Sequence, residues 1–369
     1  MRNRLKKLTI KGFKTIRSIT DFDPGSLAVL IGPNGAGKSN FVSFFRMLAW
    51  TLASPGNLQR HVGELGGASA LLHDGPAKTR EIEAELTLTT EEGENLYAFR
   101  MVYAAGDTLI YADEKCCFSR SSRSGSGPWV DFGAGHRESK LISTADAGDT
   151  TARVILSLLR KIVVYQFHNT SATARMRGKW DLEDNRWLKE DAANIAPFLR
   201  RLQESENKSY LRITDTIRQI LPFFADFDLE HDNGRLLLKW REINSDRVFN
   251  ASQAADGMLR VIALVTLLLQ PERDLPDVLI LDEPELGLHP YAINLVGGLI
   301  RGVSTKTQVI VATQSMPLID CFAPDDIVVV ERKARESEFK RLKAEALVDW
   351  LINYSLSELW EKNVIGGRP

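Results

Sequence analysis

Gly32-Pro33-Asn34-Gly35-Ala36-Gly37-Lys38-Ser39 is the stretch that decides the fold of this chain. It matches the pattern G-x-x-x-x-G-K-[ST], in which glycines precede a lysine and a hydroxyl residue. The five residues before it, 27–31, form a short apolar run, as in a strand that is buried on both faces. The apolar residues after it recur at helical spacing over 40–50. A strand, a glycine loop and a helix in this order predict a phosphate-binding loop, or P-loop.

Each residue type in this loop has a physical reason. Glycines allow positive φ angles, so that successive N–H groups can face phosphate oxygens, and the next helix presents its positive end to the same anion. We expect Lys38 to contact the β- and γ-phosphates of ATP and Ser39 to bind Mg²⁺. The alternative is a glycine-rich turn that binds nothing. The expected nucleotide-contacting residues are Gly32, Pro33, Asn34, Gly35, Ala36, Gly37, Lys38, Ser39 and Asn40.

The composition is that of a globular protein with a balanced charge. The chain has 369 residues, enough for two domains or for one large nucleotide-binding domain with an insertion. Its 47 Lys and Arg residues face 48 Asp and Glu residues, so any contact with nucleic acid has to be local. There is no signal-peptide core, and the most apolar run, 261–269, is too short to cross a membrane. Three cysteines make no disulfide framework, and we expect a cytoplasmic protein without a membrane partner.

The pattern along the chain predicts four regions. Residues 1–75 are expected to form the N-terminal part of the ATPase core, with 60–72 as a loop. Residues 76–150 alternate polar and apolar side chains and predict an antiparallel β insertion, with a mobile loop at 119–135. Residues 151–250 predict a helical and β insertion. Residues 251–369 alternate helices and strands, which predicts the C-terminal part of a mainly parallel sheet.

A second acidic motif follows the apolar strand predicted at 278–281. A P-loop needs one carboxylate to hold Mg²⁺ and, for hydrolysis, another to orient water. We expect Asp282 to bind the metal and Glu283 to act as the general base. Carboxylates in this position lie at the carboxyl edge of the sheet, where ligands of α/β proteins bind. The alternative is a solvated acidic turn.

These residues carry a family resemblance. Asp282-Glu283-Pro284-Glu285-Leu286-Gly287-Leu288-His289-Pro290 closely resembles the Walker B and D-loop segment of ABC-type ATPases related to RecF, SMC proteins and OLD-family nucleases. Residues 8–16 and 31–40, and the closing 356–360 with Gly366 and Gly367, are similar to short ATPases of this group. The resemblance implies an α/β fold: a P-loop NTPase of the ABC-ATPase head type, with a mixed, mainly parallel core sheet, an antiparallel β subdomain and a helical insertion. No sustained heptad pattern separates the two motifs, so the insertion is expected to be compact.

In this family two protomers enclose ATP, and a signature motif of one caps the γ-phosphate bound by the other. Ala255, Asp256 and Gly257 are the candidates here. Ala255 stands where relatives usually carry serine, so one hydroxyl donor is missing, although backbone N–H groups at a helix N-terminus can replace it. Ser252 in a shifted register and an ordinary helix cap are the alternatives.

Two further positions depend on the resemblance. Gln314 stands where ABC proteins commonly have a switch histidine, and an amide cannot carry a proton as an imidazolium can, which predicts slow turnover. Gln166 or His168, at the end of another strand, resembles the Q-loop, and we expect Gln166 to approach the metal. Cys116, Cys117 and His136 match no standard zinc spacing.

These observations predict a MgATP-dependent ATPase in which Glu283, Lys38 and Gln314 carry the chemistry. The resemblance implies a homodimer that controls DNA-related or nuclease activity, with a separate effector protein as partner and anti-phage defence as a context. The alternative is a scaffold that sequesters and releases an effector without relying on hydrolysis. A third interpretation is direct DNA binding, either through residues 332–343 or through Arg153, Arg160, Lys161, Arg175, Arg177 and Lys179.

Overall fold

A six-stranded, mainly parallel sheet forms the centre of the molecule. The computed structural model describes residues 3–121 and 127–368. The strand order of the sheet is β17-β16-β3-β15-β14-β8, and only β17 runs antiparallel to its neighbour. Every residue of β3, β14 and β15 is buried, because both faces of these apolar strands are covered. The strands are β3 (Leu27–Ile31), β8 (Ile162–Tyr165), β14 (Val278–Asp282), β15 (Gln308–Ala312), β16 (Ile327–Lys333) and β17 (Glu336–Arg341).

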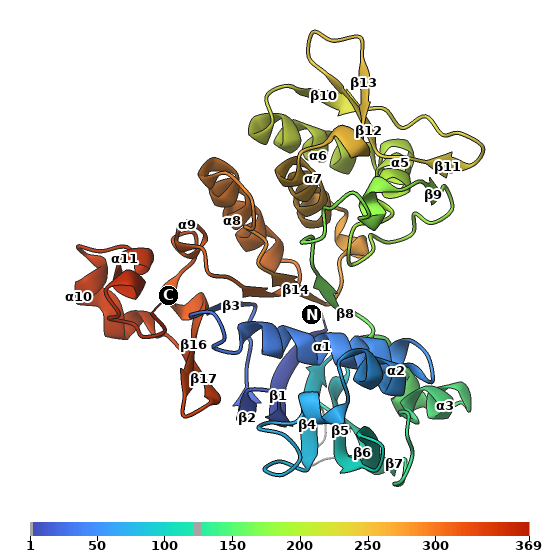
Figure 1. Ribbon diagram of the computed structural model, residues 1–369, viewed down its shortest axis with the longest axis vertical. Coiled ribbons are helices and arrows are strands. Elements are labelled where there is room, and N and C mark those ends of the chain that lie inside the picture. Colours follow the sequence, from blue (N-terminus) through green and yellow to red (C-terminus); the bar gives the residue numbers. More distant parts are fainter. Residues whose placement is uncertain (1–2, 122–126, 369) are drawn as a thin grey trace.

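An antiparallel sheet lies beside this core, in the lower part of Figure 1. Its strand order is β2-β1-β4-β5-β6-β7, so it includes the first two strands of the chain. The antiparallel β insertion expected at 76–150 thus shares its sheet with two strands from residues 1–75. The reason is long-range pairing: β1 binds β4 along seven registered residue pairs. The strands are β1 (Arg4–Phe13), β2 (Ile16–Phe22), β4 (Glu81–Thr89), β5 (Gly93–Ala104), β6 (Thr108–Arg120) and β7 (Trp129–Asp131).

The segment predicted as a mobile loop at 119–135 is shorter than expected. β6 continues to Arg120 and β7 occupies 129–131, where it pairs with β6. Residues 122–126 of this prediction lie outside the described residues.

The P-loop helix α1 (Lys38–Ala53) lies between the two sheets (Figure 1). Its buried side chains pack in one apolar cluster with the antiparallel sheet and with alternate residues of the central strands, such as Leu30 and Ile280. The intervening residues, such as Val29 and Leu281, pack into a second cluster on the other face. α2 (Asn57–Glu64) runs through part of the segment predicted to be a loop at 60–72, because its apolar positions Leu58 and Val62 are buried.

A helical lobe stands on the opposite face of the central sheet, in the upper part of Figure 1. The helix α7 lies at the base of this lobe and is almost entirely buried. Two small sheets, β10-β12-β13 and β11-β9, complete the lobe. β8 belongs to the central sheet, although its residues fall within the range expected to be an insertion. The helices are α5 (Ile195–Ser205), α6 (Asn207–Ile220) and α7 (Asp256–Leu269); the strands are β9 (Trp180–Asp181), β10 (Phe224–Phe227), β11 (Arg235–Leu236), β12 (Lys239–Glu242) and β13 (Val248–Asn250).

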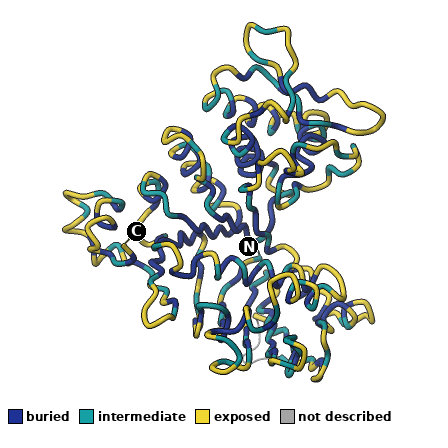
Figure 2. The backbone as a smooth tube through the Cα atoms, in the orientation of Figure 1, coloured by how far each residue is buried: buried dark blue, intermediate teal, exposed yellow. Residues whose placement is uncertain are grey.

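Of the remaining helices, α8 packs beside α7 on the same face of the central sheet, and α4 packs against β5 and β6. Figure 2 shows that burial is nearly continuous along the central strands. Among the described residues, no helix is long and apolar enough to cross a membrane. These helices are α3 (Leu141–Asp146), α4 (Thr150–Leu159), α8 (Pro290–Ser304), α9 (Met316–Ile319), α10 (Val348–Leu351) and α11 (Leu356–Glu361).

Candidate functional site

The glycine loop joins β3 to α1 at the carboxyl edge of the central sheet. Gly32 and Gly37 have φ angles of 152° and 121°, and a Cβ at either position would lie 2.1 Å from a neighbouring oxygen. Only glycine therefore fits these two positions without displacing the neighbouring chain. Lys38 is 4% exposed, and its Nζ donates hydrogen bonds to the carbonyls of Gly32 and Pro33, the latter at 3.1 Å. Burial lowers the pKa of Lys38.

The start of α1 is hydrogen-bonded to a neighbouring turn, whereas other residues of the loop are exposed to solvent. Asn40 Nδ2 donates to Thr15 Oγ1 at 2.7 Å, which anchors the start of α1 to the turn between β1 and β2. Asn34, Gly35 and Ser39 are exposed. Within the described residues, the hydroxyl of Ser39 has no hydrogen-bond partner in the chain.

Asp282 ends β14 and remains buried, with 6% of its surface exposed. Its Oδ2 accepts from Gln166 Nε2 at 3.3 Å and from Arg46 Nη2 at 3.4 Å. Its Oδ1 is buried and has no hydrogen-bond partner within the described residues. Burial raises the pKa of Asp282. A buried oxygen without a donor, together with the exposed hydroxyl of Ser39, is a donor set that suits the hard, oxygen-binding cation Mg²⁺.

The segment after β8 is fixed to the same aspartate. Gln166 Nε2 donates to His168 Nδ1 at 2.7 Å, and His168 Nε2 donates to the carbonyl of Asp282 at 2.9 Å. Both bonds are satisfied by the neutral histidine tautomer that carries its proton on Nε2. The structure thus brings both candidate Q-loop side chains to Asp282, and Gln166 is the one that reaches its carboxylate.

Glu283 and Gln314 face each other across the ends of β14 and β15. Gln314 Nε2 donates to Glu283 Oε1 at 2.7 Å, and the Glu283 N–H donates to the carbonyl of Ala312 at 2.8 Å. Glu283 has a φ of 44°, an unfavourable region for a residue with a side chain. Such local strain persists only where the surroundings hold it, and it is common at functional sites.

Glu285 is a residue whose role the sequence reasoning missed. Its Oε1 accepts from Thr313 Oγ1 at 2.5 Å and from the N–H of Gln314 at 3.1 Å. Burial raises the pKa of Glu285. This carboxyl therefore fixes the backbone of the turn that carries Gln314. Its place two residues after Glu283 in the motif was the only signal that could have indicated it.

The candidate signature residues lie at the N-terminal end of α7. Ala255 is the N-cap and makes no side-chain cap. Arg177 pairs with Asp256 at 3.0 Å and donates to the carbonyl of Ala254 at 3.1 Å. The alternative residue, Ser252, already donates its hydroxyl to Asn250. Among the described residues, no hydrogen bond joins 254–257 to the P-loop of the same chain.

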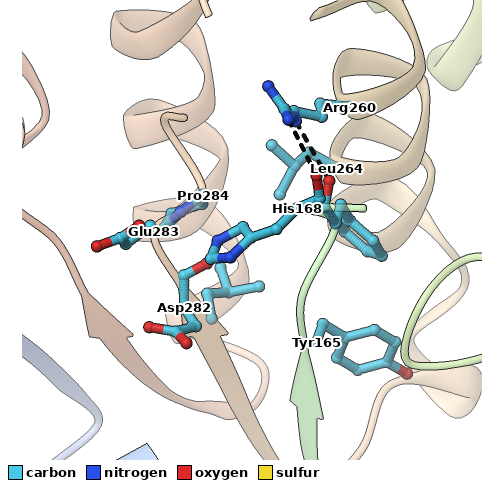
Figure 3. A pocket seen from close by; sticks show the side chains of 9 residues that line it. Tyr165, His168, Arg260, Leu264, Asp282, Glu283 and Pro284 are labelled. Carbon is cyan, nitrogen blue, oxygen red and sulfur yellow. Dashed lines mark hydrogen bonds between the residues drawn. The ribbon is translucent and has the colours of Figure 1, made fainter. Parts of the chain in front are cut away.

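Arg260, also missed, connects α7 to two site segments. Its guanidinium donates to the carbonyls of Phe167 and His168 at 3.2 and 3.0 Å, and to the carbonyl of Leu286 at 3.1 Å. Figure 3 shows Arg260 on the wall of a small pocket that also includes Asp282. One arginine therefore ties the signature helix to the segment after β8 and to the segment after Glu283.

Cys116, Cys117 and His136 do not converge as metal ligands. His136 instead lies 2.8 Å from Glu114 through Nε2. Within the described residues, no group of three or more His, Cys, Asp or Glu side chains is arranged to hold a metal ion.

The sequence of this chain matches one known protein family. The family described as "AAA domain, putative AbiEii toxin, Type IV TA system" matches residues 27–98 and 152–320, more than half of the chain. These stretches contain the P-loop, Gln166, Asp282 and Gln314. No curated protein sequence matches.

Two solved structures are similar over nearly the whole chain. One is an Smc head bound to the C-winged helix domain of ScpA, with 17% identity and a TM-score of 0.61, covering 94% of this chain and 99% of that one. The other, from Pyrococcus furiosus, is an Smc head domain with an extended coiled coil bound to the C-terminal domain of ScpA, with 15% identity and a TM-score of 0.57, covering 95% and 99%. At this identity the likeness shows the fold, and it confirms the predicted α/β P-loop domain of ABC-ATPase head type.

Proposed function

Since this chain belongs to the family of AAA domains described as putative AbiEii toxin of Type IV TA systems, we propose that it is a slowly hydrolysing MgATPase that dimerises around ATP and controls a separate effector. Its fold is that of the ABC-type ATPase heads of the SMC and RecF group. The finer statements about dimerisation, slow turnover and effector control are our proposal.

The observation that carries the proposal is the convergence of four distant segments on one edge of the central sheet. The P-loop follows β3, Gln166 follows β8, Asp282 and Glu283 end β14, and Gln314 follows β15. Parallel strands place their carboxyl ends at one edge, which is where α/β proteins bind ligands. A glycine turn or an acidic turn formed for packing alone gives no reason for this convergence.

The chain's residues have distinct tasks in this reaction. The loop N–H groups and Lys38 bind the phosphates, and Ser39 and Asp282 hold Mg²⁺. When bound, Mg²⁺ neutralises charge that develops on the phosphate oxygens. Glu283 takes a proton from the attacking water, and Gln314 holds the Glu283 carboxylate in place through its amide.

The second half of the site is proposed to come from another copy of the chain. Asp256 has 60% of its side chain exposed at the N-terminal end of α7. This helix end presents N–H groups suited to a γ-phosphate. Arg177 and Arg260 connect the same end of α7 to its own neighbouring loops, so ATP binding in the partner can be transmitted to the segment beside Asp282.

Slow turnover follows from Gln314. Its amide positions Glu283 but neither accepts nor releases a proton near neutral pH. A hydrolysis step of this kind serves better to time a conformational state than to drive rapid work.

The test compares wild-type protein with two variants. Lys38→Ala should lose ATP binding, because a buried cation at the phosphates is removed. Glu283→Gln should keep ATP, lose turnover and accumulate a dimer, measured by light scattering with and without ATP. A monomer under all conditions, for Glu283→Gln as well, contradicts the shared site.

The non-enzymatic scaffold remains the second candidate, and the same variant separates the two. A scaffold has little turnover to lose in Glu283→Gln, whereas an ATPase loses it. In either case the effector is sought by affinity purification of the full chain with and without ATP. The solved Smc heads are bound to a domain of a partner protein, which supports looking for a protein partner rather than a small ligand.

Direct DNA binding receives less support from the contacts. Four of the six basic residues expected to form a patch on the 153–179 segment pair with carboxylates, and Arg160 donates to a backbone carbonyl. Their charge is therefore largely used within the chain. A binding assay across salt concentrations tests the interpretation, because phosphate contacts predict a steep loss of affinity.

A further inference from the structure

The hairpin of β16 and β17 is fixed directly to the P-loop. β16 runs parallel to β3, the strand that leads into the loop. Ser337, on β17, is hydrogen-bonded through its hydroxyl to the carbonyl of Ala36 at 2.6 Å and to Thr15 Oγ1 at 2.7 Å. A Cβ at Gly37 would collide with the same serine. The hairpin and the phosphate-binding loop are therefore one packed unit.

The strand register directs Arg332 towards this loop. Arg332 is paired with Ser337 across the hairpin, and directly opposed residues in an antiparallel pair have their side chains on the same face. Nη1 of Arg332 lies 3.9 Å from the position that a Cβ on Gly35 would take. The neighbouring Lys333 belongs to the other face and pairs there with Glu331 at 3.0 Å.

Arg332 also differs from its neighbours in its charge partners. Lys333 pairs with Glu338 as well as Glu331, and Arg335 pairs with Asp74 at 2.9 Å. Arg332 is exposed and has no carboxylate partner within the described residues. An arginine next to a phosphate-binding loop, without an anion of its own, is suited to bind phosphate through its planar donors.

We propose that Arg332 is an additional phosphate ligand, which contacts the di- or triphosphate of a nucleotide from the hairpin side while the loop N–H groups and Lys38 contact it from within. This inference rests on the proposed nucleotide site. It assigns to the hairpin a role in binding that the motif at 32–39 does not include.

The experiment measures the dissociation constants of ADP and ATP. Each nucleotide is titrated into the full chain that carries a bound fluorescent nucleotide, and the displacement of the fluorescent nucleotide is followed. A lost charge-assisted hydrogen bond is worth roughly 1.5–3 kcal/mol, so Arg332→Ala should weaken the binding of both nucleotides by about 10- to 150-fold. Arg332→Lys should restore part of the affinity, because it keeps the charge. Arg332→Ala should also reduce the salt dependence of binding.

Lys333→Ala and Arg335→Ala are the matched controls, since each removes one positive charge from the same hairpin. Both should leave the dissociation constants unchanged. Equal weakening by Lys333→Ala, or unchanged binding by a folded Arg332→Ala, overturns the inference. Failure of the wild-type chain to bind ATP overturns the proposed function instead, so the two failures are distinguishable.

Discussion

Two buried carboxylates in this molecule have opposite surroundings. Glu114, in the antiparallel sheet, is fully buried, and both its oxygens are occupied by donors. Tyr97 and Ser139 donate to Oε1 at 2.6 and 2.5 Å. His136 and the N–H of Lys140 donate to Oε2 at 2.8 and 2.9 Å. These donors attach the loop after β7 to the sheet.

Asp282, at the edge of the central sheet, is nearly as buried but incompletely bonded. Its two bonds, to Gln166 and Arg46, are long and share one oxygen, and the other oxygen has no partner within the described residues. A buried polar group normally has its partners, so an unbonded oxygen needs a reason. Glu114 is thus fully bonded within the chain, whereas Asp282 keeps a buried oxygen available to a ligand at the edge where the P-loop lies.

The largest expected effect is on Asp282. Asp282→Asn should lower ATP hydrolysis on the order of 1,000-fold, because charge stabilisation by a bound metal is worth several kcal/mol. The folding stability should not fall, since no completed set of donors is broken. Steady-state hydrolysis and urea unfolding check both statements. The exposed Asp215→Asn is the control, and a variant that unfolds in place of losing turnover refutes the contrast.

The reverse outcome is expected for Glu114. Glu114→Ala leaves several buried donors unsatisfied and should lower the free energy of unfolding by about 3–5 kcal/mol, measured in urea. Hydrolysis per folded molecule should stay near wild type. Glu85→Ala, exposed on the same sheet, should change stability little. If Glu114→Ala lowers the free energy of unfolding by less than about 1 kcal/mol, the substitution acts like an ordinary surface change, and the prediction is wrong.

Glu285 tests whether the turn that carries Gln314 matters to the site. Glu285→Ala removes the acceptor of Thr313 and of the Gln314 N–H, and kcat should fall about tenfold because Gln314 no longer holds Glu283. Glu285→Gln keeps a carbonyl oxygen there and should restore most of the rate. The dissociation constant of ATP should change little in either variant. If kcat is the same in Glu285→Ala and Glu285→Gln, Glu285 does not position Gln314.

The smallest effect concerns pH. Burial raises the pKa of Asp282, so the native state binds its proton more readily than the unfolded chain does. Ionised Asp282 therefore lowers stability at neutral pH, and this penalty disappears as the pH falls towards about 4, the ordinary range of an aspartate. In EDTA, Asp282→Asn should be more stable than wild type at pH 8, and the difference should shrink as the pH falls below about 4. Urea unfolding at both values measures the difference, and a pH-independent gap would contradict the assignment.

Much of the fold could be predicted from short segments. The strand predicted at 278–281 is present as β14, and residues 251–369 alternate helices and strands as predicted, because hydrophobic periodicity acts over a few residues. The alternation at 76–150 predicted antiparallel strands, but it did not indicate that β4 pairs with β1, since alternation does not specify which strand is the partner.

Some residues of the candidate site could be predicted from the sequence, and others could not. Lys38, Asp282 and Glu283 stand in motifs that residue types and spacing reveal. Arg46 and Arg332 stand in no motif.

The sequence by itself determined the P-loop, the acidic pair at 282–283 and the alternating order of helices and strands, because each of these depends on neighbouring residues. Only the tertiary structure decided that Gln166 and Arg46 share one oxygen of Asp282 while the other stays unbonded, and that Arg332 lies beside Gly35. The physical reason is that these contacts join residues from separate strands and helices. Their positions follow from how the sheet orders its strands and how the core packs, which no local pattern encodes.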